Sequence, residues 1–275
     1  MVLEMGDSVI SRQRIVGAVL SLLFLGAILC ATAPAGGQQA ASITVSAAMS
    51  LKDALDELGH TYEQRHPDAK VIFNYGSSGT LQHQIEQGAP VDIFLSAAEK
   101  QMDALESAGL LMAGTRQDLV GNQLVLVVPT SSNILKDFSD LARPEVKIVA
   151  LGEPGTMPAG MYARQALEHL GLLAAVEKKA VYAKDVRAVL TYVETGNADA
   201  GIVYQTDART SSKARIAATA PAATHDPIAY PAAVIRTTKN MTAARAFLDF
   251  LASANARAVF ERYGFTPAEK QAGKK

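Results

Sequence analysis

Short apolar runs rich in β-branched residues alternate along this chain with segments whose apolar residues recur at helical spacing. Residues 43–47 form one such run, and the segment after Ser50 carries Leu51, Ala54, Leu55 and Leu58 on one face. Further strands are predicted over residues 71–73, 91–95, 123–128, 147–151, 200–204 and 228–235, and further helices from near Thr80, Pro158 and Asp185. Strands that alternate with helices predict α/β sheets with parallel strands.

The first 40 residues have the pattern of a secretory signal peptide. Arg12 and Arg14 precede an apolar run over residues 15–29, and residues 31–33 read Ala-Thr-Ala, a small-residue cleavage pattern. We therefore assign residues 1–40 to a signal peptide and expect an exported protein. Cys30 is the only cysteine, and whether it carries a lipid is left open.

Composition excludes several classes of protein. About 235 residues remain after the signal peptide, enough for one large or two modest α/β domains. They contain no cysteine, so disulfides and thiolate metal sites are excluded. The formal net charge of −1 gives no basic face for nucleic acid.

Five short stretches stand at predicted strand ends or helix starts, and none brings a lysine, a metal ligand or a nucleophile with its base. They are Ala48-Met49-Ser50, Gly76-Ser77-Ser78-Gly79-Thr80, Pro158-Ala159-Gly160, Asp185-Val186-Arg187 and Gly201-Ile202-Val203-Tyr204. A helix N-terminus offers free N–H groups and the positive end of the helix dipole. In open α/β sheets, ligands bind at the carboxyl ends of strands. The pattern predicts a site that holds an anion with neutral donors.

Each of these residues also has a structural interpretation. Ser50 with Asp53 resembles a capping box, and Ser78 belongs to a loop that could be an ordinary connection. Ala159 could offer only its N–H, Val186 could pack in the core, and Tyr204 could be structural at a strand end.

Enzyme motifs are missing from the sequence. It has no Gly-x-Ser-x-Gly elbow, no phosphate loop and no Gly-x-Gly-x-x-Gly after the first strand, and its five histidines match no zinc pattern. A hydrolase that uses Ser78 stays open as an alternative of another class, but no base for it is identifiable. The chain is expected not to be an enzyme.

Taken in order, the motifs resemble those of the periplasmic molybdate-binding proteins of ABC transporters over nearly the whole mature length. The matching stretches are residues 43–45, 47–51, 75–81, 88–94, 158–163, 184–187, 201–204 and 262–265. The resemblance implies a type II periplasmic binding protein fold, in which two α/β lobes are joined by two crossing strands with a ligand cleft between them. The implied ligands of molybdenum, bound as its oxyanion, are Ser50, Ser78, Ala159, Val186 and Tyr204. Gly79 stands where some relatives have a third serine, and Met49 where they often have alanine.

The resemblance also implies the domains and the partners. The crossing strands would be residues 123–128 and 229–235, so that lobe one comprises residues 41–122 plus 232–275 and lobe two residues 123–231. The protein would be a periplasmic receptor that delivers molybdate, and in some cases tungstate, to a membrane permease and its ATPase. A monomer without a cofactor is expected. A receptor for sulfate or another tetrahedral oxyanion is the alternative on the same fold, and the signal peptide argues against an effector domain of a transcription regulator.

Overall fold

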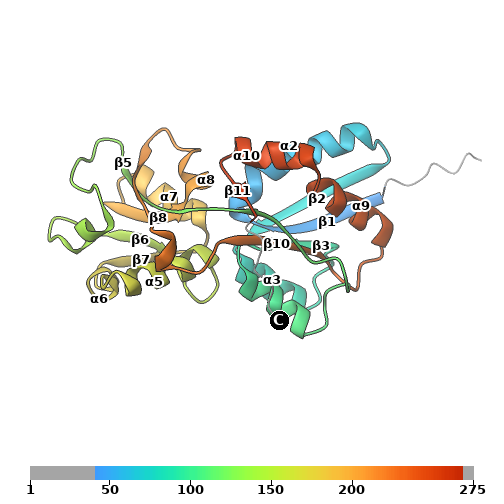
Figure 1. The fold of residues 1–275 in the computed structure, drawn as a ribbon, viewed down its shortest axis with the longest axis horizontal. Coiled ribbons are helices and arrows are strands. Elements are labelled where there is room, and N and C mark those ends of the chain that lie inside the picture. Colours follow the sequence, from blue (N-terminus) through green and yellow to red (C-terminus); the bar gives the residue numbers. More distant parts are fainter. Residues whose placement is uncertain (1–40, 269–275) are drawn as a thin grey trace, which may run out of the picture. The chain divides into compact units, whose positions relative to one another are not determined.

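A computed structural model describes residues 41–268, which form two β-sheets with helices packed against them (Figure 1). The signal peptide and Cys30 lie outside the described residues. Within them, no helix combines the length and the apolar character needed to cross a bilayer.

The first sheet has the strand order β11-β4-β10-β3-β1-β2. Strands β1, β2 and β3 are parallel, whereas β10 runs antiparallel to both β3 and β4, and β11 runs antiparallel to β4. Its strands are β1 (Ala41–Ala48), β2 (Ala69–Gly76), β3 (Ile93–Leu95), β4 (Gln117–Gly121), β10 (Ala229–Val234) and β11 (Thr266–Pro267). The helices that accompany it are η1 (Met49–Leu51), α2 (Lys52–Arg65), α3 (Ser78–Glu86), α4 (Glu99–Ser107), α9 (Met241–Leu251) and α10 (Ala254–Arg262).

The second sheet has the strand order β7-β6-β8-β5-β9. Strands β6, β7 and β8 are parallel, and β5 runs antiparallel to β8 and β9. Its strands are β5 (Leu124–Pro129), β6 (Val149–Gly152), β7 (Ala180–Ala183), β8 (Ala200–Tyr204) and β9 (Ala214–Thr219). The accompanying helices are η2 (Phe138–Ala142), α5 (Pro158–His169), α6 (Leu173–Glu177), α7 (Val186–Glu194), α8 (Gln205–Ala208) and η3 (Ala222–Thr224).

The fold class is confirmed, but the prediction of parallel sheets is wrong in part. Each sheet has three parallel strands joined by helices, flanked by antiparallel strands that the alternation pattern did not reveal. The strands that run against the parallel set include β10 and β5, and each of these is the first strand after the chain has passed from the other sheet. Strands β4, β7 and β9 were not predicted at all, since their short, partly exposed runs carry weak apolar patterns.

The apolar spacing of the helices is explained by the face that each one buries. In α7, Val186, Val189, Leu190 and Val193 are buried, which is the one-sided pattern of a helix packed on a sheet. Because α7 follows β7 directly, this packing fixes its N-terminus beside the carboxyl ends of the parallel strands.

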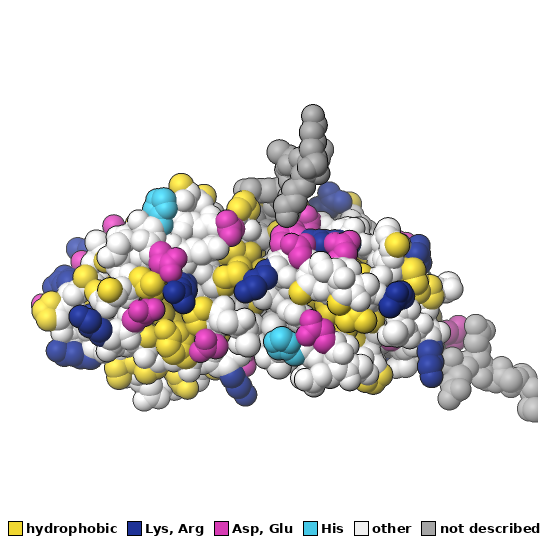
Figure 2. Space-filling view, turned by 90° about the horizontal axis from the view of Figure 1, so that it is seen from below, with side chains coloured by type: hydrophobic (Ala, Val, Ile, Leu, Met, Phe, Trp, Pro, Cys, Tyr) yellow, Lys and Arg dark blue, Asp and Glu magenta, His cyan; other side chains and the backbone are white. Residues whose placement is uncertain are grey.

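The chain passes between the sheets at two places. Asn122 and Gln123 connect β4 of the first sheet to β5 of the second, and the segment after β9 returns the chain to β10. The lobe boundaries given above stay a prediction. On the face seen in Figure 2, Lys and Arg side chains are interspersed with Asp and Glu rather than gathered by sign.

Candidate functional site

One small cavity is lined by all five of the residues that sequence reasoning singled out. Its lining comprises Ala48, Met49, Ser50, Gly76, Ser77, Ser78, Ala97, Met157, Pro158, Ala159, Val186 and Tyr204. The five predicted residues are each at most 5% exposed. The cavity measures about 20 Å³, far below the roughly 300–1,000 Å³ of sites for drug-sized ligands. In this conformation it suits only a ligand of a few atoms.

Ser50 does not cap a helix, so the predicted capping box is wrong. It lies inside η1, and the residue that precedes α2 is Leu51, which makes no side-chain cap. The Ser50 hydroxyl instead forms a hydrogen bond of 2.9 Å with the Tyr230 hydroxyl. The reason is that β1 runs directly into η1, so Ser50 is already within the helical turn and faces the buried end of β10.

Ser78 is the first residue of α3, and its neighbour Ser77 is the cap. The Ser77 side chain accepts a hydrogen bond from the Thr80 N–H. The Ser78 Oγ accepts one from the Ala97 N–H at 3.0 Å, and the residue is fully buried. A hydroxyl that accepts still has one proton to donate, so Ser78 can donate into the cavity.

Ala159 and Val186 bring backbone N–H groups from two helix N-termini of the second sheet. Ala159 is the second residue of α5, which begins at Pro158, and Val186 is the first residue of α7. The first N–H groups of a helix have no acceptor within the helix. Asp185 caps α7 through the N–H of Ala188, which leaves the earlier N–H groups for another acceptor.

Tyr204 stands at the carboxyl end of β8, and its hydroxyl reaches across to the first sheet. It donates a long hydrogen bond of 3.4 Å to the carbonyl of Ala97. Burial raises the pKa of Tyr204 well above its ordinary value, so the phenol stays protonated and can act as a donor. A second contact between the sheets joins the Gly79 N–H to the carbonyl of Thr156 at 2.8 Å.

The cavity therefore offers hydroxyl and N–H donors without a formal charge. Among the described residues that line it there is no Lys, Arg, His, Asp or Glu. Residues 41–268 also contain no cluster of three or more His, Cys, Asp or Glu suited to a metal ion. Donors at helix N-termini, in a site shielded from water, are suited to a small anion.

Comparison with known proteins identifies the family. The model of the bacterial extracellular solute-binding proteins matches residues 43–266. The chain belongs to this family. Among curated members, YvgL of Bacillus subtilis (strain 168), named as a substrate-binding lipoprotein of an ABC transporter, is 47% identical over 82% of this chain and 86% of that protein. The molybdate-binding protein ModA of Escherichia coli (strain K12) is 39% identical over 89% of this chain and 96% of ModA. The resemblance noted from the motifs is thereby confirmed.

A solved structure gives the same result for the fold of this solute-binding protein. The periplasmic molybdate-binding protein of Azotobacter vinelandii superposes with a TM-score of 0.75 at 24% identity, over 82% of this chain and all of that one. Members of the family serve as substrate-binding components of transporters, and those of ABC transporters work with a permease and an ATPase.

Sequence reasoning missed the residues that stand behind the cavity of this solute-binding protein. Tyr230 and Asn122 are buried and form a hydrogen-bonded group with Ser50. In the sequence, Tyr230 is visible only as a residue with a hydroxyl in an otherwise apolar strand. Asn122 is visible only as a polar residue between two strands. Ala97, which contacts both Ser78 and Tyr204, gave no signal because it acts through its backbone.

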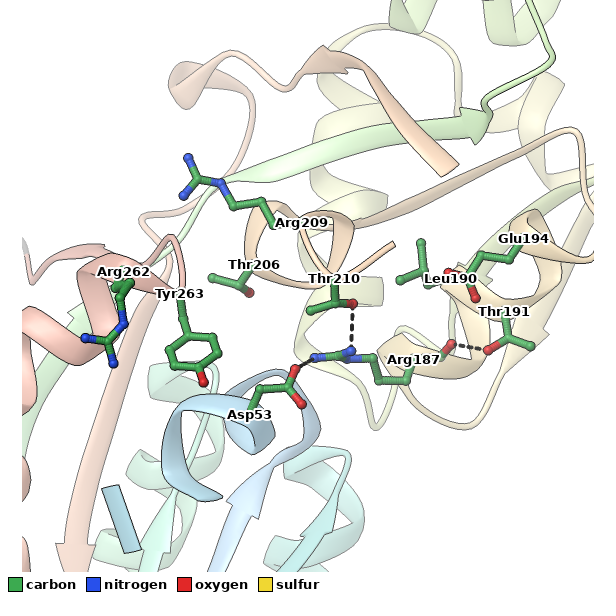
Figure 3. Close-up of a pocket in the computed structure, with 10 residues that line it drawn as sticks. All are labelled: Asp53, Arg187, Leu190, Thr191, Glu194, Thr206, Arg209, Thr210, Arg262 and Tyr263. Carbon is green, nitrogen blue, oxygen red and sulfur yellow. Dashed lines mark hydrogen bonds and ion pairs between the residues drawn. The ribbon is translucent and has the colours of Figure 1, made fainter. Parts of the chain in front are cut away.

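A larger groove of about 790 Å³ lies beside Arg187, and none of the five predicted residues lines it (Figure 3). Arg187 donates to the buried Asp207 at 2.9 Å and to Thr210 at 2.8 Å, and it forms an ion pair with Asp53. Asp53 belongs to α2 beside the first sheet, whereas Arg187 and Asp207 belong to α7 and α8 beside the second. Arg187 therefore links elements of both sheets, and its charge is already matched by carboxylates.

Asp207 is a fully buried carboxyl whose pKa is strongly raised. Burial raises its pKa from 3.8 to about 7, the Arg187 guanidinium opposes the rise, and Asp53 and Asp185 add to it. One of its oxygens, Oδ2, has no hydrogen-bond partner among the described residues. A carboxyl that gains only one partner on burial binds its proton more tightly than in water.

Asp207 should make the free energy of unfolding fall as the pH rises from about 5 to about 7. The pKa of Asp207 is higher in the folded state, so the folded state binds more protons in this window, and the stability given by the protonated form is lost as pH rises. Relative to Asp207→Asn, the parent should lose roughly 1–2 kcal/mol between these two pH values. Urea unfolding of both proteins measures this difference. Parallel stability curves would mean that Arg187 keeps Asp207 ionised throughout.

Proposed function

We propose that this chain is an extracytoplasmic receptor that binds molybdate or tungstate and delivers it to an ABC importer. The observation that carries the proposal is the small buried cavity, which gathers Ser50, Ser78, Ala159, Val186 and Tyr204 without any formally charged side chain. Relatives named as molybdate-binding proteins, 39% identical over most of the chain, support the choice of anion.

The proposed roles of the five residues follow from their chemistry. Ser50 and Ser78 donate from hydroxyl groups, and Ala159 and Val186 donate from backbone N–H groups at helix N-termini. Tyr204 donates from its phenol by turning its single proton from the Ala97 carbonyl to the anion. A dianion without protons accepts from all five, because every one of its oxygens carries only lone pairs. The helix dipoles add favourable potential, and hydrogen bonds to a charged acceptor are the stronger kind.

A hydrolytic role for Ser78 has no support in this arrangement. A serine nucleophile needs a general base within hydrogen-bond reach. The described residues lining the cavity include no His, Asp or Glu, and the Ser78 hydroxyl accepts a hydrogen bond from the backbone N–H of Ala97. We therefore propose a binding function without catalysis and without a cofactor.

Delivery to a transporter requires the anion to be enclosed and then released. We propose that residues 1–40 export the chain to the periplasm, where it acts as a monomer beside a molybdate permease and its ATPase. The five donors come from elements of both sheets, so only a closed cleft surrounds the anion. The ligand then favours the closed state through contacts that the open state lacks.

The ligand panel is the first test of this function. Molybdate and tungstate should bind, and hydrogen phosphate should bind about 1–3 kcal/mol more weakly, because its O–H meets donors and leaves one of them unpaired. Sulfate should bind weakly through a mismatch in size. Isothermal titration calorimetry of the mature protein with the four anions measures these differences. Equal affinity for hydrogen phosphate and molybdate would contradict the proposal.

Substitutions at Ser78 and Ser77 should separate an effect on molybdate affinity from an effect on stability. Ser78→Ala removes a hydroxyl donor to the anion and should weaken molybdate binding about tenfold or more. Ser77→Ala removes the cap of α3 and should lower the free energy of unfolding by about 0.5–2 kcal/mol, with a smaller effect on binding. Calorimetry and urea unfolding of the ligand-free proteins measure the two effects. A Ser78→Ala variant that folds and binds like the parent would show that the site is wrongly assigned.

Gly79 should be needed for closure. In this arrangement a Cβ at residue 79 would lie 2.4 Å from the carbonyl oxygen of Thr156, so a side chain here requires the Thr156 backbone to move away. Gly79→Ala should therefore weaken molybdate binding by about tenfold or more while leaving the ligand-free protein folded, since alanine suits a helix better than glycine does.

Small-angle scattering with and without molybdate provides the second measurement for Gly79. The radius of gyration of the parent should fall on binding, and that of Gly79→Ala should fall by a smaller amount. Gly155→Ala is the matched control, because a Cβ there would meet only a side-chain oxygen of Glu153 at 3.9 Å. Normal affinity and normal compaction in Gly79→Ala would exclude closure through this contact.

A further inference from the structure

Three buried polar residues that do not line the cavity are connected to Ser50 by hydrogen bonds. The Tyr230 hydroxyl is 2.9 Å from the Ser50 Oγ and 3.0 Å from the Asn122 Nδ2. The same Asn122 nitrogen is 2.9 Å from the Thr206 Oγ1. Tyr230 is fully buried, and Asn122 and Thr206 are at most 8% exposed. These contacts form a chain of hydrogen bonds from Thr206 to Ser50.

The orientation of the Asn122 amide is fixed by a backbone group. Its Oδ1 accepts a hydrogen bond of 2.9 Å from the Gln123 N–H. A backbone N–H can only donate, so the atom that faces it must be the amide oxygen. The NH₂ group therefore faces Tyr230 and Thr206, and Asn122 donates to the Tyr230 hydroxyl.

Tyr230 must then donate to Ser50. Burial raises the pKa of Tyr230 well above its ordinary value, so the phenol keeps its proton. Asn122 supplies one hydrogen bond to its oxygen, and Ser50 is the remaining partner among the described residues. If Ser50 donated instead, the Tyr230 proton would be buried without an acceptor, which is costly.

We propose that Tyr230 and Asn122 are positioning residues that fix Ser50 as a donor toward the bound anion. Ser50 accepts from Tyr230, so its own proton is left to point into the cavity that it lines. The inference rests on the proposed function, because the group that receives this proton is the oxyanion. We call the hydrogen-bonded chain Thr206–Asn122–Tyr230–Ser50 the relay. Asn122 lies in the connection between β4 and β5 and is bonded to α8 through Thr206, so the relay is fixed where the chain passes between the sheets.

A fixed donor also contributes to selectivity. A free serine hydroxyl can rotate to accept a hydrogen bond from a protonated anion and donate elsewhere. Ser50 already accepts from Tyr230, so accepting a second bond from the anion would leave the Ser50 proton buried without an acceptor, which is costly. The relay therefore favours molybdate over hydrogen phosphate at this position.

Tyr230→Phe tests the relay by removing the bond that orients Ser50. Molybdate affinity should fall about fivefold to tenfold, and the ratio of molybdate to hydrogen phosphate affinity should fall with it, as measured by calorimetry. In a Ser50→Ala background, Tyr230→Phe should change the affinity little, because the group it orients is gone. Tyr162→Phe is the control: this buried hydroxyl contacts the Pro227 carbonyl at 3.4 Å, and its loss should leave molybdate binding unchanged.

Asn122→Asp provides a second variant of nearly the same shape, in case Tyr230→Phe does not fold. A carboxylate only accepts, so Tyr230 would donate to it and Ser50 would donate to Tyr230. The reversed relay should lower molybdate affinity at least tenfold. Adding Ser50→Ala to the Asn122→Asp variant should lower the affinity little further.

Nuclear magnetic resonance of the ligand-free protein tests the contact without the anion. Ser50 lies in η1 directly after β1, and Tyr230 lies in β10 of the same sheet as β1. A slowly exchanging Tyr230 hydroxyl proton should therefore show a nuclear Overhauser effect to the Ser50 β protons. This signal in a protein that fails to bind molybdate would overturn the proposed function and support the relay. Molybdate binding that Ser50→Ala weakens and Tyr230→Phe leaves unchanged would overturn the relay. If the losses of binding free energy caused by Ser50→Ala and Tyr230→Phe added fully in the double variant, the relay would be overturned as well.

Discussion

Buried hydroxyl and N–H groups need hydrogen-bond partners, and this requirement organises the centre of the protein. Ser50, Ser78 and Tyr204 are nearly excluded from water, and each satisfies part of its capacity with a neighbour from another element. All three line one cavity without a charged side chain. An acceptor of several hydrogen bonds completes the arrangement, and this explains why a small oxyanion fits where a larger or cationic ligand does not.

Contacts around the cavity join elements of the first sheet to elements of the second. Tyr204 reaches Ala97, Gly79 reaches Thr156, and Arg187 joins Asp53 to Asp207. The contacts of Tyr204 with Ala97, Gly79 with Thr156 and Arg187 with Asp53 join elements of one sheet to elements of the other, so an opening of the proposed cleft would break them. Binding and closure are therefore expected to be one event, in which the ligand adds contacts that neither half makes alone.

Much of this could be predicted from local patterns. The strand over residues 200–204 ends at Tyr204 as predicted, and α5 and α7 begin at or next to the predicted residues because Pro158 and Asp185 are strong starting signals. The antiparallel strands β4 and β9 and the role of Ser50 could not be predicted. Short, partly exposed strands have little periodicity, and a serine after a strand is compatible with either a cap or a buried contact.

The sequence by itself determined the α/β class, the family and the five positions at strand ends and helix starts, because these depend on periodicity and on residue types adjacent in the chain. Only the tertiary structure decided that these positions share one cavity and that Ser50 contacts Tyr230, 180 residues further along. It also decided that Asn122 donates to Tyr230, since that follows from the direction of a backbone N–H. Contacts between distant segments depend on how the sheets bring the ends of their strands together. The spacing of residue types along the chain does not determine that geometry.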